Sequence, residues 1–141
     1  MPADVALAVR LAVPVERIVC TARLDCGVSS ARAAERALGA FLQWFALVPT
    51  IGNGEHHVML RGPVDALWHA ASLNTAFYRD LCDRVAGGFV DHHPRDDHPP
   101  RTWVIETVAR LIGAYGPGLS PLLTAWSPST AAAMRQARAR C

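Results

Sequence analysis

The chain has 141 residues, of which 51% are hydrophobic and 18% charged, and its formal net charge is +2. This length suits a single domain spanning residues 1–141 that buries roughly 70% of its unfolded surface. So small a charge disfavours nucleic acid as a partner, and the apolar runs are shorter than the ~20 residues that cross a bilayer. We therefore expect a cytoplasmic protein with no membrane helix, and its four cysteines form no CxxC pair.

Apolar residues recur with helical spacing along the first third of the chain. One helix is predicted after Pro14 and a stronger one before Pro49, with Ser29 or Ser30 as its N-cap. The apolar positions of the two helices are Val15, Ile18, Val19 and Ala22, then Ala34, Leu38, Phe41 and Phe45. Residues 49–62 read as a loop or a small hairpin that turns at Asn53 and Gly54.

A long helix is predicted to begin at Pro63 and to end near Gly87 and Gly88. Its buried stripe consists of Val64, Trp68, Ala71, Thr75, Tyr78, Cys82 and Val85. Asn74 and Thr75 are both good N-caps, so the helix can also break there into two.

The remaining chain predicts a polar loop and then further helices. Three prolines exclude regular helix from the segment GFVDHHPRDDHPPR, and Thr102 is a candidate cap for the next helix. Ser120 with Pro121 and Ser127 with Pro128 open two later helices. The predicted fold class is all-α, a single compact bundle of about five to six helices with a His/Asp-rich loop.

Asp65 and His69 lie four residues apart on the predicted helix and therefore share one of its faces. Such a pair could bind a metal together, or Asp65 could hold the imidazole in one orientation. The alternative interpretation is an acidic residue that interacts with the helix dipole beside a hydrogen-bonded, half-buried histidine.

The segment from Asp91 to His98 places three imidazoles and three carboxylates within eight residues. A divalent metal would offset the mutual repulsion of the carboxylates, and imidazole suits Zn, Cu, Fe and Ni. The alternative is a solvated loop held by its prolines, because no spacing within it is diagnostic.

Two other pairs of side chains could carry chemistry. His56 and His57 are adjacent, so in extended backbone they point to opposite sides, and we expect both to be solvent-exposed. Tyr78 and Cys82 lie one turn apart on the buried stripe, where they are either core residues or a redox-active phenol and thiolate. No sequence motif of hydrolases, NTPases or dinucleotide-binding enzymes is present.

The stretch from Leu47 to Pro94 resembles the core signature of the glycine-rich domain-containing protein family. The matching positions are Pro49, Asp65, Trp68, His69, Thr75, Tyr78, Cys82, Gly88, His92, His93 and Pro94. The later helix, with Thr107, Tyr115 and Gly116, is similar to the one that follows in bacterial members, so the resemblance covers about 36–117. It implies a helical domain with a recurring histidine set and no assigned reaction. Ala71 departs from the pattern, because a second histidine often stands there.

Two cues, the face shared by Asp65 and His69 and the later His92–His93 turn, together favour a small metal-dependent enzyme. His69, His92 and His93 would hold one Fe, Cu or Zn ion, and Asp65 and Tyr78 are the candidate catalytic residues for a small-molecule substrate. An unbroken helix of ~20 residues would span about 30 Å and carry the chain away from His69. The helix must therefore break near Asn74 for His92 and His93 to return to His69.

The alternative function is a non-catalytic helical protein–protein interaction module. In this interpretation Trp103, Trp126 and the Arg-rich C-terminus bind a protein partner, and the histidines are structural. A third interpretation, nucleic-acid binding through the C-terminal arginines, is the least favoured because the net charge is so small. The oligomeric state is not indicated by the sequence.

Overall fold

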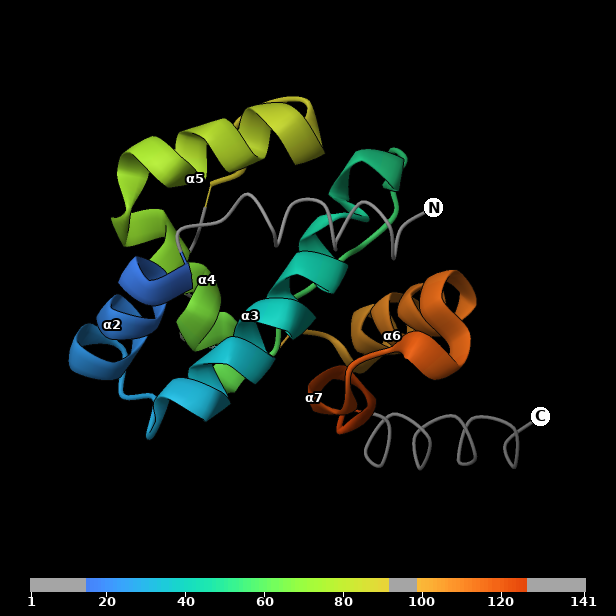
Figure 1. The fold of residues 1–141 in the computed structure, drawn as a ribbon. Coiled ribbons are helices and arrows are strands. Elements are labelled where there is room, and N and C mark those ends of the chain that lie inside the picture. The colour runs from blue at the N-terminus through green and yellow to red at the C-terminus, as the bar shows by residue number, and fades with distance from the viewer. Residues whose placement is uncertain (1–14, 92–98, 127–141) are drawn as a thin grey trace.

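A computed structural model describes residues 15–91 and 99–126 of the chain (Figure 1). Within these ranges the regular elements are all helical, which confirms the predicted all-α fold class. The α-helices are α2 (Val15–Asp25), α3 (Ala31–Phe45), α4 (Pro63–Leu73), α5 (Thr75–Leu81), α6 (Arg101–Tyr115) and α7 (Pro121–Thr124). Short helical turns are η1 (Val48–Thr50), η2 (Cys82–Ala86) and η3 (Gly116–Gly118). None of the helices described is long and apolar enough to cross a bilayer.

Helix α3 lies at the centre of the fold and packs against α2, α4 and α7. In Figure 1 it runs diagonally through the molecule, with α2 and α4 on one side and α6 and α7 on the other. Of the two N-caps that the sequence allows, Ser29 and Ser30, the structure uses Ser30, whose hydroxyl accepts a hydrogen bond from the Ala33 amide at 3.1 Å. Its buried residues are Ala34, Ala37, Leu38, Ala40, Phe41, Leu42, Trp44 and Phe45.

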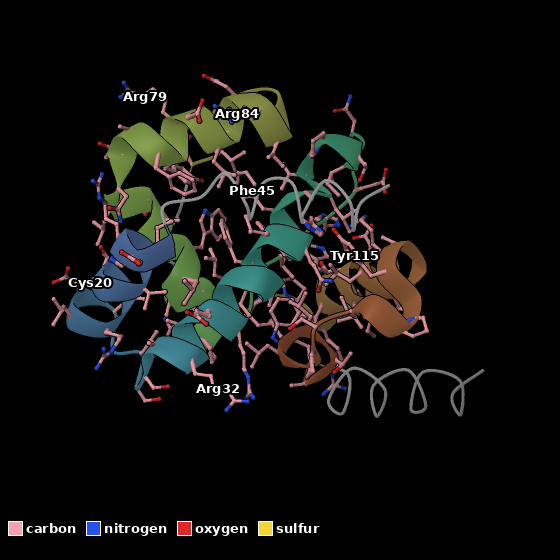
Figure 2. The ribbon with its side chains drawn as sticks, in the orientation of Figure 1. Cys20, Arg32, Phe45, Arg79, Arg84 and Tyr115 are labelled. Carbon is pink, nitrogen blue, oxygen red and sulfur yellow. The ribbon has the colours of Figure 1, made fainter. Side chains whose placement is uncertain are left out.

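Aromatic rings join α3 to its neighbours. The ring centroid of Trp68 on α4 lies 4.8 Å from that of Trp44 and 6.5 Å from that of Phe41. The ring of Phe45 lies 6.1 Å from Tyr78 on α5, and Figure 2 shows Phe45 between α3 and α5. These separations are typical of favourable aromatic pairs, so the rings form the centre of the hydrophobic core.

The long helix predicted from Pro63 breaks at Asn74, one of the two residues at which the sequence allowed a break. Asn74 has φ −88° and ψ 70°, which turns the chain out of the helix. Its side-chain amide donates to the Ala70 carbonyl at 2.9 Å and to the Thr21 hydroxyl of α2 at 3.2 Å. The amide therefore satisfies a carbonyl at the end of α4 and ties the break to α2.

The break changes part of the predicted stripe. Most of its members are buried, namely Val64, Trp68, Ala71, Tyr78 and Cys82, but Thr75 is exposed and Val85 is only half-buried. Gly87, with φ +72°, ends η2 in the left-handed conformation that glycine adopts without a steric penalty.

The two predicted caps near the C-terminus differ in outcome. Helix α6 begins at Arg101 with Pro100 as its N-cap, so Thr102 lies inside the helix and the prediction that it is the cap was wrong. Ser120 does cap α7, and its hydroxyl accepts from the Leu122 amide at 3.3 Å. The helix start predicted at Ser127 lies outside the described residues.

The side chain of Gln43 on α3 holds the turn between α6 and α7. Its amide donates to the Gly118 carbonyl at 2.8 Å, and its carbonyl oxygen accepts from the Ser120 amide at 2.8 Å. The Tyr115 hydroxyl donates to the Gln43 main-chain carbonyl at 2.8 Å. Figure 2 shows Tyr115 where α6 approaches α3, and burial raises its pKa to about 12.

Candidate functional site

The structure places only part of the predicted metal site. Asp65 and His69 lie one turn apart on α4, and both are half-buried. His92, His93 and His98 lie outside the described residues. Within residues 15–91 and 99–126, no group of three or more His, Cys, Asp or Glu side chains is arranged to hold a metal ion. The convergence of His69 with the later pair therefore stays a prediction.

Tyr78 connects α4 to the beginning of the His/Asp-rich loop. The Trp68 indole N–H donates to the Tyr78 phenol oxygen at 2.9 Å, and the Tyr78 hydroxyl donates to the Val90 carbonyl. The ring of Phe89 meets the edge of Tyr78 at 5.5 Å and 85°. The chain thus enters the loop beside Trp68, the sequence neighbour of His69.

The environment of Tyr78 is that of a buried structural phenol. Desolvation raises the pKa of Tyr78 well above its usual value, and the neighbouring Cys82, which is fully buried, acts in the same direction. The hydrogen bond from Trp68 acts in the opposite direction but does not overcome burial. The phenol proton is directed at the Val90 carbonyl, and the role of Tyr78 as acid or radical partner stays a prediction.

A second cluster, which the sequence interpretation missed, forms where the connecting segment (residues 51–62) passes between α3 and α6. His57 is its centre. The Nε2 atom of His57 lies 2.9 Å from the Trp44 carbonyl oxygen, and its Nδ1 atom lies 3.1 Å from Nη1 of Arg110. Its ring stacks on the Trp44 ring, with centroids 4.6 Å apart.

His57 is held in its neutral form. Desolvation by burial is the largest cause that lowers its pKa, and the positive charge of Arg110 adds to it. The hydrogen bond with the Trp44 carbonyl acts in the opposite direction, and the resulting pKa is about 4.

His56 also contacts α6. Its Nδ1 atom lies 3.0 Å from Oε2 of Glu106, and its backbone N–H donates to the same oxygen, also over 3.0 Å. Its ring stacks on Trp103 with centroids 4.0 Å apart and an angle of 10° between the rings. Both histidines are half-buried, so their expected solvent exposure was wrong.

Arg110 joins both histidines to α6. Its Nη1 donates to the His56 carbonyl at 2.6 Å, and its Nη2 donates to Oε2 of Glu55 at 3.1 Å. The same Nη2 lies 3.9 Å from Oε1 of Glu106. The Arg110 side chain is only 15% exposed, so these are partly desolvated charges that depend on one another.

A chain of hydrogen bonds continues from this cluster across the fold. The Trp44 indole N–H donates to the Val58 carbonyl at 2.9 Å, and the Val58 N–H donates to the Thr107 hydroxyl at 2.9 Å. Thr107 in turn donates to the Trp103 carbonyl at 2.8 Å. The connecting segment is thereby hydrogen-bonded to α3 and α6 together.

A hollow of about 470 Å³ lies between α2 and the beginning of α3. It is lined by Glu16, Val19, Cys20, Arg23, Leu24, Val28, Ser29, Ala31 and Glu35. Leu24 is 77% exposed, and Cys20 is an exposed thiol at the edge of α2 (Figure 2). An apolar hollow of this size falls in the range of binding pockets.

Charged side chains of α5 and η2 turn outward. Figure 2 shows Arg79 and Arg84 on the outer side of these elements, away from α3. Arg84 forms an exposed ion pair with Asp80 at 3.1 Å, which contributes little stability.

Two parts of the described chain thus remain as candidates for function, namely Asp65 and His69 beside the loop entry and the hollow between α2 and α3. The resemblance to the glycine-rich domain-containing family stays a prediction, carried by the residues quoted for it. Comparison with known proteins identifies no relative, since no family model, no curated protein and no solved structure matches the chain.

Proposed function

We propose that the chain is a small, non-catalytic helical module that binds a protein partner, and that its histidines at the connecting segment are structural. The observation that carries this proposal is the hollow between α2 and α3, at which Leu24 is 77% exposed. The structural role of the histidines is supported by the engagement of both ring nitrogens of His57, one with the Trp44 carbonyl and one with Arg110. A ring engaged in this way has no nitrogen left for a metal or a substrate proton. Tyr78 supports the same interpretation, because its phenol oxygen bridges Trp68 and Val90.

The hollow between α2 and α3 is the proposed binding surface. Trp103, which the sequence suggested as a contact residue, is half-buried and stacked on His56, whereas Leu24 is exposed beside an apolar hollow. Two carboxylates, Glu16 and Glu35, and one guanidinium, that of Arg23, line this hollow. A partner that inserts a large apolar side chain with a basic neighbour is complementary to it.

A pair of matched substitutions tests this proposal. We expect Leu24→Arg to weaken retention of a partner from the source cells by about tenfold or more, as loss of a central apolar contact does. Ile112→Arg is the control, because Ile112 is also an exposed apolar residue (48%) but lies on α6. Equal retention by both variants, with unchanged circular dichroism, would count against the α2–α3 surface.

The second candidate function is a metal-dependent enzyme that acts on a small molecule. One observation in its favour is the Tyr78–Val90 hydrogen bond, which holds the beginning of the His/Asp-rich loop near α4. Another is the break at Asn74, which the loop needs in order to return toward His69. His69, His92 and His93 would bind one Fe, Cu or Zn ion, and Asp65 would orient a ligand or complete the coordination.

Elemental analysis of protein purified without a His tag separates the two functions. The metal proposal requires about one equivalent of a transition metal that is lost in both His69→Ala and His93→Ala. His56→Ala is the control, because the contacts of His56 are with Glu106 and Trp103 and its removal leaves the proposed ligands unchanged. Metal-free protein, or metal that persists in both ligand variants, rejects this function and leaves the first.

A further inference from the structure

The connecting segment is fastened to α6 mainly by polar contacts of a few side chains. Glu55, His56 and His57 of the segment meet Glu106 and Arg110 of α6, and we call these five residues the His57–Arg110 clasp. Arg110 alone bonds to all three segment residues, through Glu55 Oε2, the His56 carbonyl and His57 Nδ1. The Arg110 part of this attachment therefore depends on the protonation state of the His57 ring, whereas the neighbouring Val58–Thr107 hydrogen bond does not.

The contacts of His57 determine where its single proton lies. The Trp44 carbonyl can only accept a hydrogen bond, so Nε2 of His57 carries the proton and donates it. Nδ1 is therefore unprotonated and accepts from Arg110. A second proton, on Nδ1, would place two donors and two positive charges against each other across the present 3.1 Å contact.

We propose that the His57–Arg110 clasp is an acid-sensitive latch: protonation of His57 on Nδ1 displaces Arg110 and loosens residues 55–57 from α6, while the Val58–Thr107 hydrogen bond and the helical core stay in place. The low pKa of His57 agrees with this geometry, because the ring accepts a proton only when the pH falls well below neutrality. The segment then loses the Arg110 contacts with Glu55 and with the His56 carbonyl at the same time, since one guanidinium makes them all.

Other charged groups around the latch are two carboxylates and one imidazole. Glu106 comes from α6, and Glu55 and His56 come from the segment itself, whereas α3 contributes Trp44 but no charged side chain to these contacts. These groups lie beside the same guanidinium, so the test must separate them from His57. The variants His57→Gln, which is neutral at every pH, and Glu106→Gln, which keeps an acceptor, provide that separation.

The rest of the fold does not depend on the latch. Helix α6 also packs through Leu111 and Tyr115, which belong to the hydrophobic core. Beyond α6, the bonds of Gln43 to Gly118 and Ser120 involve amides and main-chain groups that do not titrate. The loosening of residues 55–57 is therefore local, and α3 and the end of α6 keep their contacts.

Nuclear magnetic resonance between pH 7 and pH 4 tests this proposal on the intact chain. The ring nitrogens of His57 report its protonation, the indole N–H of Trp44 reports its bond to Val58, and amides of α3 report the core. We expect the Trp44 and Val58 signals to shift together with His57 titration while the α3 amides stay in place. In His57→Gln that coupled shift should disappear, and in Glu106→Gln it should remain.

Three results would overturn the latch. One is that α3 and the connecting segment lose structure at the same pH, which would be global unfolding. Another is that His57→Gln keeps the transition whereas Glu106→Gln abolishes it, which would assign it to the carboxylate. If His57→Gln does not fold, the ring-nitrogen shifts of the unmodified protein still decide, because a His57 that titrates without a shift at Trp44 contradicts the mechanism.

Discussion

The indole nitrogen of Trp68 and the phenol oxygen of Tyr78 lie 2.9 Å apart in the core and form a hydrogen bond across the break between α4 and α5. Because the Tyr78 hydroxyl also donates a hydrogen bond to the Val90 carbonyl, one phenol satisfies a side chain and a main-chain group at once. The break at Asn74, the core and the entry of the loop are therefore coupled through a single atom.

Tyr78→Phe should lower the free energy of unfolding by about 1–3 kcal/mol, because it leaves the Trp68 N–H and the Val90 carbonyl without their partner. Urea denaturation measures this change. Tyr115→Phe is the control, since it removes one hydrogen bond to the Gln43 carbonyl, and its effect should be the smaller of the two. A larger loss in Tyr115→Phe would contradict this account.

Stability should fall at alkaline pH because burial raises the pKa of both tyrosines. An unfolded phenol loses its proton near pH 10, whereas the folded protein retains it, so the unfolded state binds fewer protons above that pH. The contribution is fully present below about pH 10 and is lost as the pH rises further. Urea unfolding followed through this range should show a decline that is weaker in Tyr78→Phe, and a flat profile would refute the assignment.

Ser30→Ala should cost about 1 kcal/mol of stability, since it removes the N-cap of the central helix. Ser29→Ala offers a matched control one residue away, because Ser29 is exposed and precedes the cap. Thermal unfolding of the two variants measures the difference. Equal effects would mean that the cap contributes nothing to α3.

Leu67→Ala should cost about 2–5 kcal/mol, because Leu67 is fully buried in the core and its truncation leaves a cavity. Leu73, on the same helix α4, is 51% exposed, and Leu73→Ala should change stability by less than about 1 kcal/mol. Chemical denaturation of both variants compares them. A similar loss in each would contradict the packing of α4.

The helices of this fold could be predicted from the sequence because their signals are local. Apolar residues at helical spacing and a serine or proline at the helix start identify α3, α4 and α7. The sequence allowed either one long helix or a break near Asn74. The structure has the break, because the Asn74 side-chain amide donates hydrogen bonds to the Ala70 carbonyl and to the Thr21 hydroxyl. The prediction of Thr102 as a cap failed because Pro100, whose ring presets the backbone, stands at the N-cap two residues earlier.

The contacts of the histidine cluster could not be predicted, because they join residues far apart in the chain. His56 meets Glu106, and His57 meets Arg110, across about fifty residues. No spacing rule connects such positions, although Glu106 and Arg110, four residues apart on one helix face, indicate a charged contact there. Asp65 and His69 do share a face of α4, as predicted, whereas the positions of His92 and His93 lie outside the described residues.

The three bonds made by Gln43 have a further consequence for how the chain can be divided. One residue of α3 specifies where the polypeptide turns after Tyr115, through atoms of Gly118 and Ser120 that lie some 75 residues later. We therefore expect α7 to have no defined position once it is separated from α3. A C-terminal segment moved to another protein of this architecture would therefore adopt the same turn only if that protein had a glutamine at the position of Gln43.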